Sequence, residues 1–495
     1  MHSSQWTYAS AAELAEALGT GKVSAVELAR DAIQRIESAD PALNAMCVKT
    51  FETALIGAAQ SDAQLARGER RPLLGVPMTI KESFNLTGAP TTWGLPEARD
   101  YRPPEDALIV SRVKAAGAVI LGKTNVPVVL GDWQSFNPIY GVTNYPYDLK
   151  RTPGGSSGGC AAALAAGFGP LSLGSDIGGS LRVPAHFCGI FAHKPTHNLV
   201  PPRGQTLPFT PALPGSTDLA VVGPMARTAD DLIALFDGIA GPDELEDGVG
   251  YRLALPPPRA TTLPGVRVLA LAQHPLTPTD APVAAAVEAL AAGLEKAGAN
   301  VSRASPLLPD FEAAARLYLR MLTATFATRI PDESFARTAS IAQVLDPADS
   351  SLAAERFRGA TRSFRGWAGD NGRRAEVRAN WRAFFLEFDA LICPISQTAA
   401  FPHDHDPDPE RRRLIVNGVE QPYQDQLLWP GVATLPGLPA TAIPAGRTPE
   451  GLPIGVQIIG PWLEDRTTLE LARLIEREFG GFVAPPAFAG TGREA

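Results

Sequence analysis

Apolar residues recur at helical spacing in several parts of the chain. Ser10 and Ser24 each begin a Ser-x-x-Glu pattern, which is typical of a helix-capping box, and apolar residues at helical spacing follow both. Further helices are expected at residues 110–116, at 281–297, directly after 154–159 and after 465. Asp280 is the expected N-cap of the helix at 281–297.

Short apolar runs lie between these helices and predict strands. The runs cover residues 74–80, 118–121, 171–173, 266–271, 390–393, 441–443 and 454–459. Strands that alternate with helices are typical of an α/β fold, in which helices cover both faces of a largely buried sheet. The sequence therefore predicts that fold class.

Irregular segments divide the chain only weakly. Residues 242–264 are rich in Pro and predict a surface connector, and residues 401–413 are expected to be a solvated loop. No repeat and no long linker is visible. We therefore expect three parts: residues 1–60 as a helical segment that packs on the core, 61–485 as a single domain and 486–495 as a tail.

Composition narrows the class of protein. Apolar residues make up 45% of the 495 positions, which is enough for a large core, and 52 acidic against 44 basic residues give a net charge of −8. An acidic balance argues against nucleic acid or an anionic membrane surface as the main partner. The start of the chain lacks the pattern of a signal peptide, and the longest apolar stretch, 161–173, is broken by Gly and Pro.

The four cysteines are far apart and show no metal-ligand spacing; they are Cys47, Cys160, Cys188 and Cys393. Scattered thiols in a chain of this length favour a reducing compartment over a disulfide framework. With the absence of a signal peptide or membrane span, this predicts a soluble, cytoplasmic protein.

Three segments carry residues suited to acyl-transfer chemistry: Lys81 at the end of a predicted strand, the Gly/Ser loop 154–159, and Ile177-Gly-Gly-Ser180. Two glycines before a serine let successive backbone N–H groups turn into one concavity, as an oxyanion hole beside a nucleophile requires. An isolated Gly-Gly-Ser is more often a plain tight turn, so this segment alone decides nothing.

The Gly/Ser loop has more than one interpretation. No Lys follows it, which excludes a Walker phosphate loop. Residues 155–159 fit Gly-x-Ser-x-Gly, the nucleophile elbow of α/β-hydrolases, with Ser157 as nucleophile. That interpretation needs a late histidine, and the candidates are His274, His403 and His405.

Two other patterns are weaker. His403 and His405 lack a third metal ligand at a recognisable spacing, so no metal site is expected there. Ser111-x-x-Lys114 fits a motif of penicillin-recognising enzymes, but the companion motifs are missing and a surface helix is the better interpretation.

Lys81 could act as a base only if its pKa fell by ~3 units, which burial without a paired carboxylate can achieve. Strand alternation turns Glu82 away from Lys81, so Glu82 need not hold the lysine as a cation. A solvated lysine at a strand end is the usual alternative.

Together the three segments resemble the amidase signature family. Residues 154–185 follow the family's signature through the Gly/Ser loop, Asp176 and Ser180. The resemblance continues in GVPMTIKESF, GKTNVP, DLAVVGPMARTADDL, GLPATAIPAG and GLPIGVQIIGPWLEDRTTLELA, and is weakest over residues 261–389. It implies the family's fold, a large mixed β-sheet covered by helices on both faces.

The resemblance also implies a Ser-cisSer-Lys triad. Ser180 would be the nucleophile, Ser156 the bridging serine after a cis peptide bond, and Lys81 the base. The oxyanion hole would consist of the backbone N–H groups of Ile177, Gly178, Gly179 and Ser180. Supporting roles would fall to Ser157, Asp176 and Arg182. No metal or organic cofactor is implied.

This triad would cleave amides through a serine acyl-enzyme, and carbamates (urethanes) and esters pass through the same chemistry. Three alternatives remain: an amidase-type subunit of a glutamine-dependent tRNA amidotransferase, an α/β-hydrolase-like esterase that uses Ser157 and a histidine, and a catalytically silent binding protein. The presence of all three triad residues argues against the silent protein.

The substrate pocket is the least defined part. Trp133, Gln134 and Phe136 lie between the signature segments and are expected to wall the site, with Tyr140 nearby. The apolar stretch 315–326 either lines a pocket or forms a core helix. An apolar pocket would favour aryl acylamides, fatty amides or carbamates over polar amides. The expected partner is thus a small molecule, and the N-terminal helices could also serve a homodimer.

Overall fold

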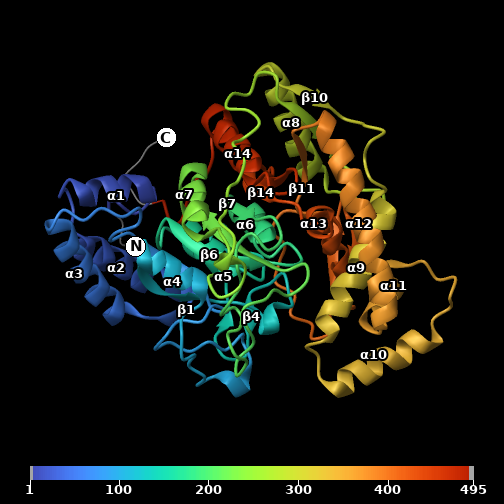
Figure 1. Cartoon of the computed structure of the whole chain (residues 1–495), viewed down its shortest axis with the longest axis horizontal. Helices are drawn as coiled ribbons and strands as arrows, with labels where there is room; N and C mark the ends of the chain where they lie inside the picture. The colour runs from blue at the N-terminus through green and yellow to red at the C-terminus, as the bar shows by residue number, and fades with distance from the viewer. Residues whose placement is uncertain (1–3, 490–495) are drawn as a thin grey trace.

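The computed structural model describes residues 4–489, and in that part of the chain eleven strands form one mixed sheet at the centre of the molecule (Figure 1). In spatial order the strands are β1 (Met46–Lys49), β3 (Val119–Thr124), β2 (Pro77–Lys81), β6 (Leu171–Asp176), β8 (Val221–Ala226), β7 (Phe191–Lys194), β14 (Ala440–Arg447), β15 (Pro453–Ile459), β11 (Ala390–Pro394), β9 (Arg267–Ala270) and β10 (Asn300–Ser302). The predicted α/β class is confirmed.

Strands β2 and β6 lie side by side in the middle of this sheet and run parallel. Strand β3 is parallel to β2 on its other side, whereas β8 is antiparallel to β6. Every residue of β2, β3 and β6 is buried. Because parallel strands end at the same edge of a sheet, Lys81 and Asp176 come out at one edge.

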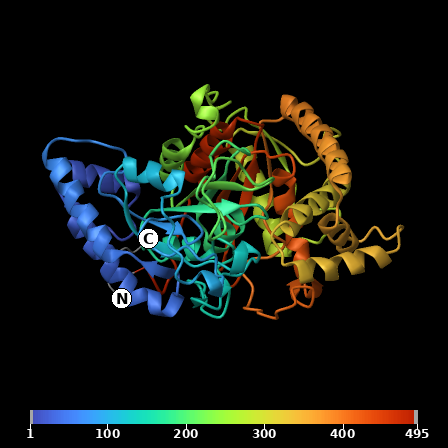
Figure 2. The ribbon, with the colours of Figure 1, turned by 60° about the horizontal axis from the view of Figure 1, so that its bottom comes forward.

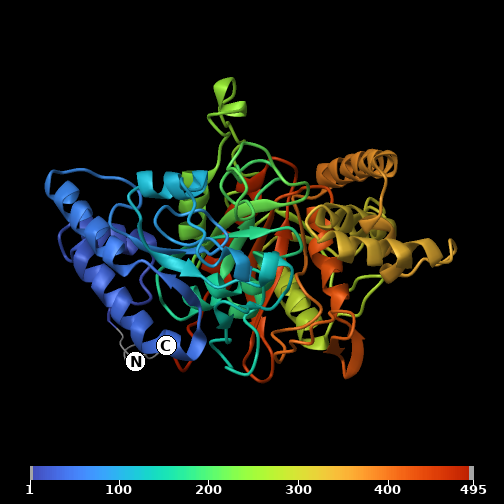
Figure 3. The ribbon, with the colours of Figure 1, turned by 90° about the horizontal axis from the view of Figure 1, so that it is seen from below.

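Helices cover both faces of the sheet and gather at its two ends (Figures 1 and 3). One end holds α1 (Ala11–Gly19), α2 (Ala25–Leu43) and α3 (Phe51–Ala66). The other end holds α9 (Phe311–Ala327), α10 (Asp332–Val344), α11 (Leu352–Ala360) and α12 (Phe364–Glu387). Figure 2 shows the same separation of the two helical groups from another side. The remaining helices are α4 (Leu108–Ala115), α5 (Gly158–Ala165), α6 (Arg182–Cys188), α7 (Ala229–Ile239), α8 (Ala281–Lys296), α13 (Leu428–Thr434) and α14 (Asp465–Phe479).

The predicted helix starts are largely confirmed. Ser10 and Ser24 both form complete capping boxes, with Glu13 and Glu27. Asp280 does occupy the N-cap of α8, but its side chain makes no capping bond. It accepts a hydrogen bond from the backbone of Asn417 instead, at 2.8 Å.

Strand boundaries differ from the apolar runs. β2 begins at Pro77 rather than at Leu74, because residues 72–75 form a turn that ends at Gly75 with φ +84°. A Cβ at Gly75 would lie 2.9 Å from the Cβ of Ala25, so the turn also lets α2 approach closely. Strands β3 and β6 continue further than predicted, into their polar ends.

The segment 401–413 is solvated only in part: Pro402, residues 409–411 and Arg413 are exposed as expected, whereas other residues pack against the protein. Phe401 and Arg412 are buried. The His405 ring stacks on Phe136 at 4.1 Å between centroids, and the Gln134 amide donates to the carbonyl of Asp404. The hairpins β4 (Phe136–Asn137)–β5 (Gly141–Val142) and β12 (Arg413–Val416)–β13 (Val419–Pro422) form two small sheets beside the main one.

Three smaller expectations concern the surface and the termini. Residues 242–264 are mostly irregular and exposed, as predicted, apart from a 3₁₀ turn at Asp247–Val249. Ser111 and Lys114 lie on α4, where Lys114 pairs with Asp106 at 2.6 Å, as expected of a surface helix. Of the expected tail 486–495, the part beyond residue 489 lies outside the described residues.

No helix within residues 4–489 is long and apolar enough to cross a membrane.

Candidate active site

Lys81 is the last residue of β2 and is fully buried. Its Nζ lies 2.7 Å from the Oγ of Ser156 and 3.0 Å from the Oγ of Ser175, which belongs to β6. The parallel pairing of β2 and β6 therefore brings an amine and two hydroxyls together at the edge of the sheet. Ser175 is a residue that the sequence analysis missed.

Burial lowers the pKa of Lys81 to about 7. No carboxylate of the described residues is within ion-pair distance of its Nζ, and the more distant charge of Asp176 opposes the shift only in part. Glu82 faces away, as expected: it accepts hydrogen bonds from the backbone of Thr92 and Trp93. A substantial fraction of Lys81 is thus neutral near pH 7 and can accept a proton.

The Gly/Ser loop carries Ser156 to this lysine. The peptide bond between Gly155 and Ser156 is cis, as the resemblance implies. The loop then runs directly into α5, where Gly159 contacts the neighbouring segment so closely that a Cβ would lie 2.4 Å from the backbone nitrogen of Asn125. Glycine at this position lets the loop sit deep against the strand ends.

Ser157 is turned away from the cavity and joins two loops. Its N–H donates to the carbonyl of Ser180 at 3.2 Å, and its hydroxyl donates to the carbonyl of Ser175 at 3.3 Å. Among residues 4–489, no histidine lines the cavity described below, and His274 packs against Phe311 and Trp429. The nucleophile-elbow arrangement is therefore not assembled in this part of the chain.

The loop from Ile177 to Ser180 is held from below by Asp176. The Asp176 carboxylate accepts from the backbone of Gly179 at 2.9 Å and of Leu181 at 3.1 Å, and pairs with the buried guanidinium of Arg182. Arg182 is held in turn by Gln457, Thr434 and the carbonyl of Pro430. Arg182 lowers the pKa of Asp176, which keeps the carboxylate charged despite its burial.

These contacts decide which backbone N–H groups of the loop are free to donate a hydrogen bond to a substrate. The Gly179 N–H is already bonded to Asp176, which differs from its expected place in the oxyanion hole. The N–H groups of Ile177, Gly178 and Ser180 have no acceptor among the described residues. Gly179 has φ +94°, a conformation that suits glycine and turns the loop so that Ser180 faces the cavity.

Two aromatic side chains hold the carbonyl side of the same loop. The Trp133 indole donates to the carbonyl of Gly178 at 2.9 Å, and the Tyr318 hydroxyl donates to the carbonyl of Ile177 at 2.8 Å. A carbonyl and the N–H of the next residue belong to one planar peptide unit. The Tyr318 bond therefore orients the free N–H of Gly178, and the Trp133 bond orients the N–H of Gly179 that donates to Asp176. Trp133 and Tyr318 thus support the loop from behind.

We expect Tyr318→Phe to lower kcat about 10-fold with little change in KM, because the ring stays and only the bond to the Ile177 carbonyl is lost. Tyr145→Phe is the matched control, since the buried Tyr145 hydroxyl also donates to a backbone carbonyl, that of Phe187, away from the site. Steady-state kinetics and thermal unfolding of both variants check this. Equal losses of kcat in the two variants would contradict a positioning role.

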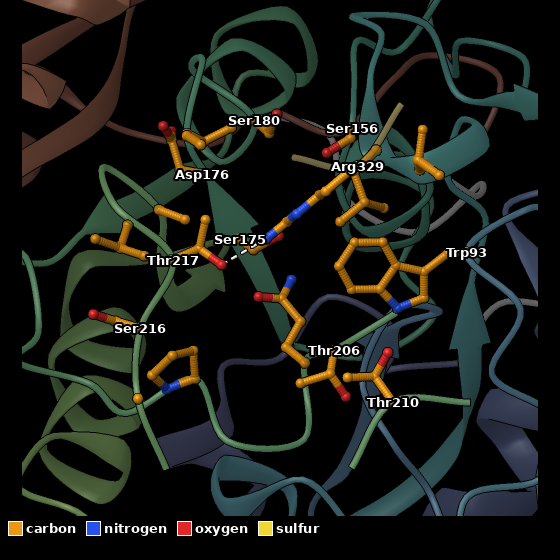
Figure 4. A pocket seen from close by; sticks show the side chains of 18 of the residues that line it. Trp93, Ser156, Ser175, Asp176, Ser180, Thr206, Thr210, Ser216, Thr217 and Arg329 are labelled. Carbon is orange, nitrogen blue, oxygen red and sulfur yellow. Dashed lines mark hydrogen bonds between the residues drawn. The ribbon is translucent and has the colours of Figure 1, made fainter. Parts of the chain in front are cut away.

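A cavity of about 380 Å³ opens above the loop (Figure 4). Ser156, Ser175, Asp176, Ile177 and Ser180 form its floor, and Figure 4 shows Ser156 and Ser180 facing the same space. Its walls are formed by Trp93, Val129, Leu130, Phe326, Arg329 and part of the segment 202–221: Pro202, Gln205, Thr206, Thr210, Pro211, residues 213–217, Ala220 and Val221. This volume is in the range of small-molecule sites.

The predicted pocket residues are not in these walls. Trp133 supports the loop from behind, while Gln134 and Phe136 contact residues 404–405. Of the apolar stretch 315–326, only Phe326 lines the cavity, and most of its large apolar side chains are buried core. The walls that the structure does show, from parts of the segment 202–221 and from Arg329, were not predicted.

No group of three His, Cys, Asp or Glu side chains in residues 4–489 is arranged to hold a metal ion. His403 and His405 lie with their rings 5.3 Å apart beside Phe136, outside the cavity walls. The four cysteines are free thiols.

Comparison with known proteins shows to which family the chain is related. The Amidase family model matches residues 27–469. Fatty-acid amide hydrolase 2-A of Danio rerio is 32% identical, over 96% of this chain and 90% of its own length. A glutamyl-tRNA(Gln) amidotransferase subunit of Symbiobacterium thermophilum is 33% identical, over 98% of this chain and 99% of its own length.

The fold agrees with this assignment. A bacterial aryl acylamidase of the amidase signature family superimposes with a TM-score of 0.79 over 96% of this chain and 97% of its own, at 24% sequence identity, which shows the shared fold. The family model and the two curated relatives each cover most of the sequence. This chain therefore belongs to the amidase family.

Proposed function

We propose that this amidohydrolase cleaves small amides through an acyl-enzyme on Ser180, with Ser156 and Lys81 as the proton path. The observation that carries the proposal is the 2.7 Å contact between Nζ of Lys81 and Oγ of Ser156, made by a buried lysine with no carboxylate partner among the described residues. A lysine in that setting can be neutral, and only a neutral amine accepts a proton.

In the proposed mechanism, Lys81 takes the proton of Ser156, and Ser156 takes that of Ser180 as its Oγ attacks the amide carbonyl. The free N–H groups of Ile177, Gly178 and Ser180 donate to the carbonyl oxygen as it becomes negative. Each donor stabilises the transition state by ~3 kcal/mol. Ser156 then gives a proton to the leaving nitrogen and takes one back from Lys81. In the second half, water loses a proton to Ser156, and Ser156 to Lys81, as the water attacks the acyl-enzyme; the protons then return by Ser156 to Ser180, which leaves as the free hydroxyl.

The proposed substrates are aryl or alkyl amides, with carbamates and esters as further candidates because they form the same tetrahedral intermediate. The second candidate is a glutamine-hydrolysing subunit of a tRNA amidotransferase, since one relative's name describes such an amidotransferase. Glutamine carries an ammonium group. Of the described residues, Asp176 is the only carboxylate that lines the cavity, and Arg182 already neutralises it. This favours the hydrolase.

The test is nitroaniline release from p-nitroanilides of increasing acyl length, compared with ammonia release from glutamine. We expect the anilides to be cleaved at least ~10-fold faster than glutamine, and the chain-length profile to report the length of the cavity. Faster turnover of glutamine would support the amidotransferase role instead. Cleavage that does not depend on Lys81 would contradict the proposed proton path.

A further inference from the structure

Arg329 lies in the cavity wall, two residues beyond the end of α9. Figure 4 shows its side chain extending across the cavity toward Thr217. Its Nη2 donates to the Thr217 hydroxyl at 2.6 Å, and its guanidinium carbon lies 5.9 Å from the centre of a Trp93 ring. These two contacts fix the direction of the guanidinium.

Arg329 has no carboxylate partner within residues 4–489. No Asp or Glu of that part of the chain is within ion-pair distance of it, and Asp176, the only acidic residue that lines the described cavity, is bonded to Arg182. A guanidinium has five N–H donors, and the single bond to Thr217 leaves the others without an acceptor among the described residues. Partial burial even lowers the pKa of Arg329, because nothing opposes the cost of desolvation.

The polar groups around Arg329 suit an anion better than an aliphatic chain. The hydroxyl of Thr206 is buried without a hydrogen-bond partner among the described residues, and Thr210 and Ser216 line the same wall. An arginine without a carboxylate partner, in a cavity that also contains hydroxyl donors, can bind a carboxylate, often in a bidentate manner. This part of the cavity differs from the apolar pocket that the sequence analysis ranked first.

We propose that Arg329 binds a carboxylate on the substrate, so that the preferred amides are N-acyl compounds carrying a free carboxylate away from the scissile carbonyl, such as half-amides of dicarboxylic acids. The inference rests on the proposed function and narrows its substrate class. Because the described walls of the cavity offer no free carboxylate for an ammonium group, the substrate carboxylate is one without a neighbouring amine.

A structural role is the competing explanation. A cation near the end of α9 also interacts favourably with the negative end of the helix dipole, whatever the ligand. Such a role would affect stability and all substrates alike. Substrate pairs that differ only in charge therefore separate the two explanations.

The kinetic test uses two such pairs. Glutaryl- and valeryl-p-nitroanilide differ by a carboxylate in place of a methyl group on the acyl side, and the valeryl amides of 4-aminobenzoate and p-toluidine differ likewise on the amine side. We expect wild type to prefer the charged member of at least one pair. Arg329→Gln should lower kcat/KM for that member about 100-fold and change the neutral member less than about 3-fold.

Arg329→Lys should retain part of the preference for the charged substrate, because lysine keeps the positive charge but lacks the paired N–H donors with which a guanidinium binds a carboxylate. Arg337→Gln, at an exposed arginine of α10 outside the cavity, is the matched control and should leave all four rates unchanged. If wild type prefers neither charged member, or if Arg329→Gln lowers charged and neutral rates equally, the inference is overturned.

A binding measurement separates this inference from the proposed function. Calorimetry with glutaranilic acid and valeranilide on Ser180→Ala should show about 10-fold tighter binding of the acid, and Ser180→Ala/Arg329→Gln should lose that difference. If wild type cleaves no anilide but this binding pattern holds, the proposed function alone fails. If anilides are cleaved and neither the binding nor the rates depend on Arg329, only the carboxylate inference fails.

Discussion

Replacing Ser180 by Ala is expected to lower kcat for amide hydrolysis by about 10⁴–10⁶-fold while the protein stays folded. Ser180 lies at the cavity floor beside three N–H groups that have no acceptor in residues 4–489, so its Oγ is the hydroxyl best placed to attack a bound carbonyl. With a slowly deacylating substrate, mass spectrometry of wild type should find the acyl group on the peptide that contains Ser180. The variant should carry no label.

Ser157→Ala is the matched control, because Ser157 is a neighbouring buried serine that bonds to the carbonyl of Ser175 instead of facing the cavity. We expect it to lower kcat only about 10-fold, through loosening of the loop. The reverse pattern, with label and activity surviving in Ser180→Ala but not in Ser157→Ala, would return the assignment to the nucleophile elbow.

Lys81→Met is expected to lower kcat by about 10²–10⁴-fold and to change the form of the pH profile. In wild type, the proton acceptor is the neutral form of Lys81, whose pKa burial has lowered to about 7. The rate should therefore fall about tenfold per pH unit below pH 7 and level off above it. The variant should lack this inflection in a kcat profile measured from about pH 5 to 10.

The same substitution should stabilise the folded protein near neutral pH. Burial disfavours the charged form of Lys81, so the unfolded chain binds more protons than the folded one between pH 7 and ~10, and wild-type stability rises with pH across that window. Lys81→Met removes the free-energy cost of burying a charged amine, but it also removes two hydrogen bonds. The net result expected near pH 7 or just below is a gain of about 2 kcal/mol in the free energy of unfolding. The gain should shrink as the pH approaches ~10.

Lys194→Met is the control for both readouts. Lys194 is equally buried, and burial lowers its pKa to about 7 as well, but it donates to the carbonyl of Pro195 and does not line the cavity. The Lys194→Met variant should be more stable than wild type near pH 7 and should keep the inflection of kcat with pH. An unchanged inflection in Lys81→Met, or a stability gain that grows with pH, would refute the role given to Lys81.

The parts of the fold that could be predicted are those with a clear apolar period, and the absence of such a period explains what was missed. Helix α3 buries only small residues, Ala54, Ala58 and Ser61, so no stripe of large apolar side chains marks it. The first half of helix α12 buries Asp370 and Arg374, and Asp370 pairs with Arg362, whereas its buried aromatic residues, Trp381, Phe384 and Phe385, are confined to the second half. Burial of charges in ion pairs leaves no apolar pattern from which a helix can be predicted.

The floor of the site could be predicted because it lies within short motifs, whereas its walls could not. Ser175 adjoins a predicted residue but gave no signal, since a serine inside a strand is common. Arg329 follows the end of a helix, where an arginine is usually solvated. It lies at the site because the distant segment around Thr217 packs beside it, which the sequence does not reveal. Trp133, Gln134 and Phe136 were expected to wall the site because their segment lies between two signature segments, but position in the sequence does not fix the direction of a side chain: the Phe136 ring stacks on His405 instead.

The brace beneath the Ser180 loop also has a consequence for protein synthesis. Arg182, which pairs with Asp176, is held by the carbonyl of Pro430 and by Gln457, partners 248 and 275 residues further along the chain. These partners leave the ribosome only after almost the entire sequence has been made. A nascent chain that ends before Gln457 already contains Lys81 and Ser180 but lacks a partner that holds Arg182. We therefore expect the Ser180 loop to gain its full support only after synthesis has passed Gln457.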